Sequence, residues 1–180
     1  MNHFFTKYFI LAVLLLYFNK LHSQVLSFHH GEIEFFTETV MSDIEAFTDK
    51  AVVKLDIQTG NFEATVNIQS FEFEYETMQE HFNGKYMESD KFPQATFKGK
   101  ILQNISNISG TTEVDASGKM TIHGVTKEIK IKAKISKKQD FTVVECKIPV
   151  VFEDYKVDEP SILSKSVAKD VLIQVSVYLK

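Results

Sequence analysis

The sequence predicts an all-β fold, an antiparallel barrel or sandwich with one or two short helices. Apolar side chains recur at every second position in many short segments, and the residues between them are polar. A glycine-containing turn at His123-Gly124 joins two such segments, and only the stretch around Met78 has helical spacing. Strands with one apolar and one polar face are typical of antiparallel sheets, and many short ones favour a closed or two-layered architecture.

Residues 1–23 have the features of a secretory signal peptide. Lys7 precedes an uninterrupted apolar run over residues 8–18, and polar residues follow it up to Gln24. The run is about half as long as a membrane-spanning helix, so we expect cleavage after Ser23 and no stable membrane span afterwards. The remaining residues, 24–180, suit a single domain.

Six segments carry the period-two pattern along this domain. In one of them Phe62, Ala64 and Val66 share a face, while the residues between them are polar. Each such segment therefore predicts a strand with one buried face. The predicted strands cover residues 53–57, 62–68, 95–101, 129–135, 144–152 and 171–179.

Glycine and proline mark the ends and turns of these strands. The apolar parity changes between Ile122 and Val125, so a reversal at His123-Gly124 returns both arms to one face. Pro93 lacks the amide that a central strand needs, which predicts a loop before residue 95. Gly99 leaves an inward position without a side chain, compatible either with space for a ligand or with a neighbouring aromatic ring.

Two helices are predicted. Thr77-Met78-Gln79-Glu80 has the form of a capping box, which favours a helix start there. Met78, Phe82 and Tyr86 follow at four-residue steps and so line one side of a short helix, whose end is loosened by Asn83-Gly84. The second predicted helix covers residues 161–169, after a proline.

Catalytic and metal-binding patterns are poorly supported. The histidines at 29, 30, 81 and 123 have no tight ligand spacing, so structural or surface roles are favoured over a zinc or catalytic site built from His81 and His123. Cys146, the only cysteine, lies on the apolar parity of its strand, which predicts a buried unreactive thiol and no internal disulfide. The acidic run at 72, 74 and 76 reads as a solvated strand face. We therefore predict a protein that is not an enzyme and has no metal or cofactor.

Charge and aromatic content narrow the function further. The formal net charge is −4 before any cleavage and becomes more negative without the leader, which does not favour nucleic-acid binding. The chain has 16 Phe and 6 Tyr but no Trp. An eight-stranded barrel can be plugged by such side chains or can hold one apolar ligand, and the alternation predicts both equally.

Two sequence blocks resemble a known family. Phe92-Pro93-x-Ala95-Thr96-Phe97, followed by residues 120–127 (MTIHGVTK), is similar to the paired signature of the YceI-like lipid/polyisoprenoid-binding family. Residues 78–91 resemble the version found in members from Bacteroidetes-type bacteria. The likeness runs from about Val25 to Lys180, with departures such as Glu128, where many members have proline. It implies a lipocalin-like antiparallel barrel of about eight strands, export, and in some members a long isoprenoid chain held inside.

The resulting interpretation is a periplasmic or secreted barrel that sequesters or carries a polyisoprenoid, a prenylquinone or a fatty acyl chain. Its rival is a ligand-free barrel that acts as an interaction module for an envelope protein, and a fainter alternative is the histidine-dependent metal enzyme. A homodimer is compatible with each. Phe71 and Phe73 have the opposite parity to Phe62, so a bulge near Ser70 or a change of face is needed to place all inside. The expected lining residues are Phe62, Val66, Phe71, Phe73, Phe97, Met120 and Ile122, with Met78, Phe82 and Tyr86 as a helical lid or plug.

Overall fold

The structure is a computed structural model that describes residues 25–37, 44–157 and 170–180. The predicted signal peptide and the predicted helix over residues 161–169 lie outside these ranges. None of the helices in the described ranges has the length and apolar character required to cross a membrane.

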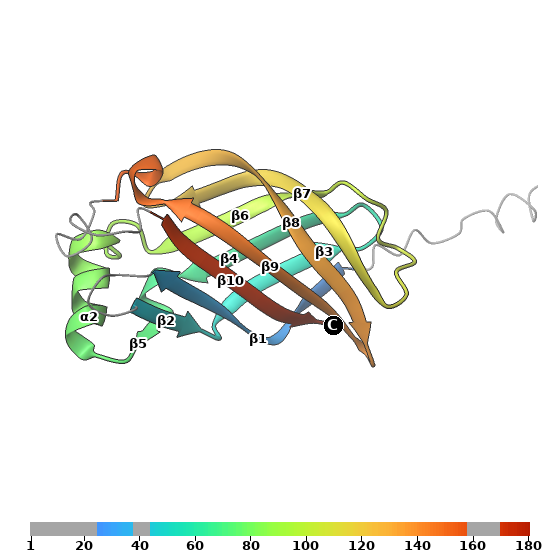
Figure 1. The fold of residues 1–180 in the computed structure, drawn as a ribbon, viewed down its shortest axis with the longest axis horizontal. Helices are drawn as coiled ribbons and strands as arrows, with labels where there is room; N and C mark the ends of the chain where they lie inside the picture. Colours follow the sequence, from blue (N-terminus) through green and yellow to red (C-terminus); the bar gives the residue numbers. More distant parts are fainter. Residues whose placement is uncertain (1–24, 38–43, 158–169) are drawn as a thin grey trace, which may run out of the picture.

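Eight antiparallel strands close into a barrel, as predicted (Figure 1). Neighbouring strands follow the order β10-β9-β8-β7-β6-β4-β3-β1, and β10 pairs back onto β1 to complete the circle. All six strands predicted from the alternation are present. The barrel strands are β1 (Val25–Thr37), β3 (Ala51–Asp56), β4 (Asn61–Asn67), β6 (Gln94–Ile101), β7 (Thr111–Ile122), β8 (Val125–Lys138), β9 (Phe141–Val151) and β10 (Asp170–Leu179).

Two short strands extend the sheet at one end of the barrel. The first residues of β1 pair with β3, whereas its last five pair with β2 (Ile44–Thr48), and β2 pairs in turn with β5 (Glu72–Phe73). Between β4 and β5 the chain makes a 3₁₀ turn, Ile68–Ser70, which is the interruption expected near Ser70. Phe71 is buried directly after this turn, so the change of parity is resolved by the break in the strand.

The β7–β8 turn has the predicted geometry. Ile122 pairs with Val125, and the two residues between them have positive φ, 48° at His123 and 72° at Gly124. Two-residue hairpin turns with positive φ at both positions match the twist of the flanking strands. A Cβ at Gly124 would also lie 2.6 Å from the ring of Phe92, so glycine is required there for space as well as for conformation.

Gly99 allows two strands to approach rather than leaving room for a ligand. It lies opposite Gly118, and a Cβ on Gly99 would stand 2.3 Å from the backbone oxygen of Ser117. A Cβ on Gly118 would be equally close to the oxygen of Lys98. Because both glycines face backbone atoms of the other strand, the missing side chains tighten the contact between β6 and β7.

The predicted helix forms, but its start and its register differ from the expectation. α2 covers Glu76–His81, and its N-cap is Tyr75, which makes no side-chain capping bond, so the predicted capping box at Thr77 is wrong. After a bend that follows β5, Tyr75 is extended and its carbonyl accepts from the amides of Met78 and Gln79, which starts the helix earlier than Thr77. A π-helix, Phe82–Tyr86, follows directly.

The π-helix changes which side chains face the barrel. The amide of Met87 donates to the carbonyl of Phe82 over 2.8 Å, five residues back, so the four-residue spacing does not continue as one stripe. Phe82 is buried, whereas Met78 and Tyr86 are only partly buried. α2 and the π-helix together are called the lid below.

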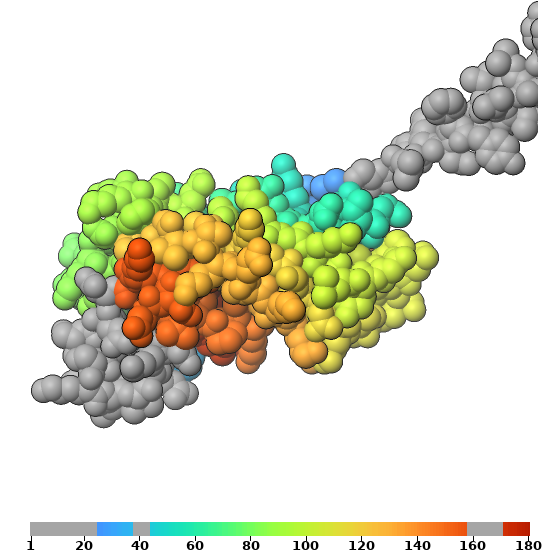
Figure 2. All heavy atoms as spheres, turned by 90° about the horizontal axis from the view of Figure 1, so that it is seen from above, coloured from blue at the N-terminus to red at the C-terminus, as the bar shows by residue number. Residues whose placement is uncertain are grey.

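The barrel is elongated, with different structures at its two ends (Figures 1 and 2). The end with the lid, the β7–β8 turn and the 3₁₀ turn Phe152–Tyr155 is called the lid end. At the opposite end, the base, Ile105 from the β6–β7 loop packs into an aliphatic cluster with strand residues. That base cluster contains Leu26, Leu55, Ile57, Ile101, Ile105, Val114, Ala116, Ala133, Ile135, Val177 and Leu179.

Candidate functional site: an apolar cavity inside the barrel

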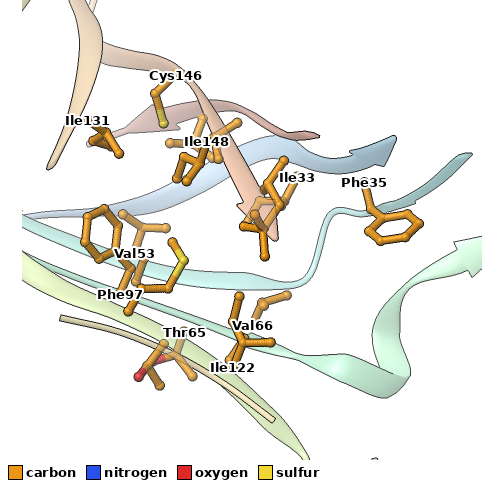
Figure 3. Close-up of a pocket in the computed structure, with 18 of the residues that line it drawn as sticks. Ile33, Phe35, Val53, Thr65, Val66, Phe97, Ile122, Ile131, Cys146 and Ile148 are labelled. Carbon is orange, nitrogen blue, oxygen red and sulfur yellow. The ribbon is translucent and has the colours of Figure 1, made fainter. Parts of the chain in front are cut away.

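A cavity of about 190 Å³ lies inside the barrel (Figure 3). One water molecule needs roughly 10–15 Å³, so this space is far larger than a packing defect. All eight barrel strands contribute side chains to its wall, and Phe71, Phe82, Met87, Phe152, Tyr155 and Val157 close it at the lid end. The cavity is thus the hollow of the barrel itself.

The wall is almost entirely hydrocarbon. No charged side chain lines the cavity in the described part of the chain. Thr65 alternates with Ala64 and Val66 on β4, which directs its hydroxyl to the outer face. Cavities with such walls stay dry and accept apolar guests.

The thiol of Cys146 forms part of this wall. Burial raises its pKa to about 11, because the thiolate would lose its hydration among apolar neighbours. The thiol is therefore protonated at neutral pH. It behaves as a small apolar group, in line with the unreactive role predicted from the sequence.

The structure places the ten predicted ligand-binding residues in three locations. Phe73 and Met78 line a second, outer groove, and Tyr86 packs against the core with the Lys85 ammonium 5.5 Å from its ring centre. The other seven line the interior cavity: Phe62, Val66, Phe71, Phe82, Phe97, Met120 and Ile122.

Several lining residues were missed from the sequence. The inward parity of β8, β9 and β10 was recognised, yet the expected lining was drawn from the aromatic segments instead. Tyr155 and Val157 follow β9 in an irregular segment without alternation, so no periodic signal marks them. The missed strand residues include Ile33, Phe35, Val53, Ile131, Cys146, Ile148, Val150, Val171, Ile173 and Val175.

Four phenylalanine rings, from Phe35, Phe71, Phe73 and Phe82, pack together at the lid end. The ring of Phe82 lies 4.9 Å from Phe73, 5.7 Å from Phe35 and 5.9 Å from Phe71, measured between ring centres. Edge-to-face and tilted contacts at these distances are favourable for aromatic pairs. This set of four rings is called the aromatic partition below.

A groove of about 670 Å³ lies on the outer face of the sheet, over β10, β1, β2 and β5. Glu32, Glu34 and Phe36 of β1 line the groove and have the opposite parity to Ile33 and Phe35, which line the cavity, so the sheet separates the two spaces. Unlike the cavity, the groove is rich in carboxylates. It is lined by Glu32, Glu34, Phe35, Phe36, Glu45, Ala46, Phe47, Glu72, Phe73, Glu74, Tyr75, Met78 and Gln174.

His123 ties together three segments of the lid end. Its Nδ1 lies 3.3 Å from the carbonyl oxygen of Tyr155, and its Nε2 lies 3.2 Å from Oε2 of Glu88. Both partners are acceptors, so both bonds form only when both ring nitrogens carry a proton. The Lys91 ammonium and, less strongly, His123 hold the pKa of Glu88 below its ordinary value.

The histidine-based metal site weighed from the sequence has no supporting geometry. His81 is exposed on α2, whereas His123 is engaged with Glu88 and Tyr155. Across residues 25–37, 44–157 and 170–180, no three His, Cys, Asp or Glu side chains gather in a way that could hold a metal ion.

Comparison with known structures shows the same fold in several solved proteins. BcnA from Burkholderia cenocepacia matches with a TM-score of 0.71 and 17% identity, over 82% of this chain and 95% of that chain. A polyisoprenoid-binding domain from Saccharophagus degradans, implicated in plant cell wall breakdown, matches with a TM-score of 0.72 and 12% identity, over 86% and 97%. The YCEI protein of Campylobacter jejuni matches with a TM-score of 0.53 and 22% identity, over 73% and 81%.

No curated protein gives a significant match to the sequence. The profile of the YceI-like domain family matches residues 17–179, which covers most of the chain and agrees with the resemblance seen in the two sequence blocks. The chain belongs to the YceI-like domain family.

Proposed function

We propose that this protein is exported and that its barrel sequesters or carries one long apolar molecule, such as a polyisoprenoid or another long-chain lipid. The observation that carries the proposal is the apolar cavity of about 190 Å³ enclosed by all eight strands. The polyisoprenoid-binding description of the Saccharophagus degradans domain, which shares the fold, supports it. The signal-peptide features of residues 1–23 support export.

The energetics of the cavity favour an occupant. An unfilled cavity costs about 24 cal/mol per Å³, so about 190 Å³ corresponds to roughly 4–5 kcal/mol. Small proteins are stable by only about 5–15 kcal/mol in total. A chain that fills the cavity offsets this cost, and each Å² of apolar surface removed from water adds about 25 cal/mol. Binding of this kind requires no catalytic group.

The rival function, an interaction module with a filled barrel, predicts an interior without such a space. Organic extraction of protein purified from its native bacterium, followed by mass spectrometry, separates the two. Long-chain lipid in about a 1:1 ratio to protein supports the carrier. Protein that is free of lipid and gains no heat stability from any long-chain prenyl lipid would overturn it.

A further inference from the structure

Three segments of the lid end each contribute a side chain that closes the cavity. Met87 directly follows the lid, Ile122 is the last residue of β7, and Tyr155 ends the 3₁₀ turn after β9. All three line the cavity. Met87 and Tyr155 lie outside the strand pairing of the barrel, so they can move away from the cavity without breaking a strand pair. The cavity can therefore open at the lid end while the sheet stays intact.

The side chain of His123 joins these three segments. His123 follows Ile122 in the β7–β8 turn, and its Nε2 bonds to Glu88, the residue directly after Met87. Its Nδ1 faces the carbonyl oxygen of Tyr155. The His123 side chain is 11% exposed and that of Glu88 34%, so the pair is largely withdrawn from solvent. The imidazole, the Glu88 carboxylate and the Tyr155 carbonyl are together called the latch.

The latch is complete only when His123 is protonated. The carboxylate and the carbonyl are both acceptors, so two N–H groups are needed, and a neutral imidazole has one. The nitrogen that loses its proton then places a lone pair against an oxygen 3.2 or 3.3 Å away. The ring of Phe92 packs edge-on against the imidazole, with 4.5 Å between the ring centres. Loss of the proton therefore removes one hydrogen bond and the charge attraction to Glu88.

The other ionisable groups around the latch do not change their charge where a histidine titrates. Histidine is the side chain whose charge ordinarily changes between pH 5 and 8. Lys91 pairs with Glu88 and holds the pKa of Glu88 below its ordinary value, so this carboxylate is ionised throughout that range. Lys127 of β8 and Asp154 of the 3₁₀ turn pair with each other at 2.5 Å. Burial raises the pKa of the Tyr155 hydroxyl, which stays neutral.

We propose that the latch is a pH-dependent lock, which holds the lid end shut when His123 is protonated and loosens when the proton is lost. Below the range in which the histidine titrates, both bonds form and the latch contributes fully. As the pH rises through that range, one bond is lost. An apolar occupant is therefore retained at pH 5 and exchanges faster at pH 8. This consequence rests on the proposed function, because it requires an occupant, whereas the loosening of the lid end does not.

Hydrogen exchange of ligand-free protein tests the latch without a ligand. The amides of Met87, Ser89 and Phe92 are bonded to carbonyls of the same irregular segment, whereas that of Ile101 is bonded to Gly60 at the base. After correction for intrinsic exchange, we expect protection of the first three amides to fall about tenfold from pH 5 to pH 8, because a hydrogen bond to a charged group is lost. Protection of Ile101 should stay unchanged.

Two matched substitutions assign the effect to one histidine. His123→Asn removes the imidazole and suits the φ of 48°, since asparagine adopts positive φ more readily than most residues. His81→Asn removes an exposed histidine from the lid and leaves the latch in place. We expect low protection at both pH values in His123→Asn and the wild-type pH dependence in His81→Asn. Unfolding midpoints close to wild type at pH 8 show that both variants fold.

Release of an apolar probe extends the test to the cavity. N-phenyl-1-naphthylamine is bound to delipidated protein, and the loss of its fluorescence is followed after dilution. We expect the probe to dissociate about tenfold faster at pH 8 than at pH 5 from wild-type protein, for the same lost hydrogen bond. The two rates should be equal in His123→Asn.

Each outcome bears on a separate claim. Wild-type lid amides that are equally protected at pH 5 and pH 8, or a His123→Asn protein that keeps the wild-type pH dependence, would overturn the latch. Probe release that is independent of pH, beside lid exchange that is not, would overturn its control over the cavity. If neither the probe nor a long-chain prenyl lipid binds while lid exchange changes as expected, the latch stands and the proposed function fails.

Discussion

At the base of the barrel, aliphatic side chains close the interior tightly, whereas at the lid end aromatic rings and an irregular backbone separate the cavity from the surface. Ile135, Val177 and Leu179 in the base cluster are each only 1% exposed. In the aromatic partition Phe71 and Phe82 are 6% and 7% exposed, and Phe35 and Phe73 are more exposed than these. The two ends therefore differ in how completely they exclude water.

The two ends also differ in their backbone conformations. Among the described residues that are not glycine, positive φ occurs at Glu88, His123, Gln139 and Lys156, and only Gln139 lies outside the lid end. Such conformations cost free energy in residues with a side chain and persist where surrounding contacts hold them. The residues with this strain are therefore concentrated at the lid end, whereas the base is closed by regular strands.

The largest expected effect comes from truncation in the base. Ile135→Ala should lower the free energy of unfolding by about 2–5 kcal/mol, because the site is fully packed and does not line the cavity. Urea unfolding followed by circular dichroism measures the change. A loss well below 1 kcal/mol would show that the base is not the closed core described here.

The cavity wall can be probed through its thiol. At pH 8 the raised pKa of about 11, against 9.0 for an unshifted thiol, leaves about a hundredfold less thiolate at Cys146 than in the unfolded chain. Iodoacetamide should therefore alkylate the folded protein at least about a hundredfold more slowly than protein in urea. Comparable rates in the two states would contradict the burial of this wall.

A matched pair of substitutions compares hollow and filled positions. Val114 in the base cluster is 2% exposed, and Val150 in the cavity wall is 7% exposed. Val114→Phe should cost about 1–3 kcal/mol through overpacking. Val150→Phe should leave the stability of ligand-free protein unchanged or higher, and it should abolish ligand binding. Equal destabilisation by both substitutions would indicate that the barrel is filled.

The smallest expected effect concerns the contacts of the lid. The lowered pKa of Glu88 means that its contribution to stability is present above pH 4.5 and is lost as the pH falls through the lowered value. Glu88→Gln should remove this contribution and speed ligand dissociation. Glu63→Gln is the control, because the pKa of Glu63 is lowered by Lys98 on the barrel wall, away from the lid. Glu63→Gln should change the stability at acid pH and leave the rate of ligand dissociation unchanged. Equal rates of ligand dissociation in the two variants would show that the contacts of Glu88 do not affect ligand release at the lid.

The strands and turns were predictable because local patterns determine them. Alternation located six strands, and the parity change at His123-Gly124 located a turn that requires positive φ at two successive residues. The helix start was mispredicted, since the capping box at Thr77 competes with the direction in which the chain leaves β5. Local propensity is a weak signal when tertiary structure sets the entry angle of a helix.

The hollow interior was not predictable from the pattern. Alternation assigns Phe62 and Phe97 to the inner face, yet the space between opposite walls depends on strand number, tilt and stagger, which are properties of the closed barrel. The aromatic partition was unpredictable for the same reason: Phe35, Phe73 and Phe82 come from two separate strands and the lid, and only the folded chain brings their rings together. The acidic run at Glu72 and Glu74 was recognised as a solvated face, but its pairing with β1 and β2 into a groove required the sheet topology.

Native mass spectrometry of delipidated protein mixed with geranylgeraniol tests the central claim, an interior that holds one apolar chain. We expect a single complex with one ligand per chain in wild-type protein, together with a higher unfolding temperature, and no complex in Val150→Phe. Wild-type protein that forms no complex and shows no change in unfolding temperature would contradict the claim.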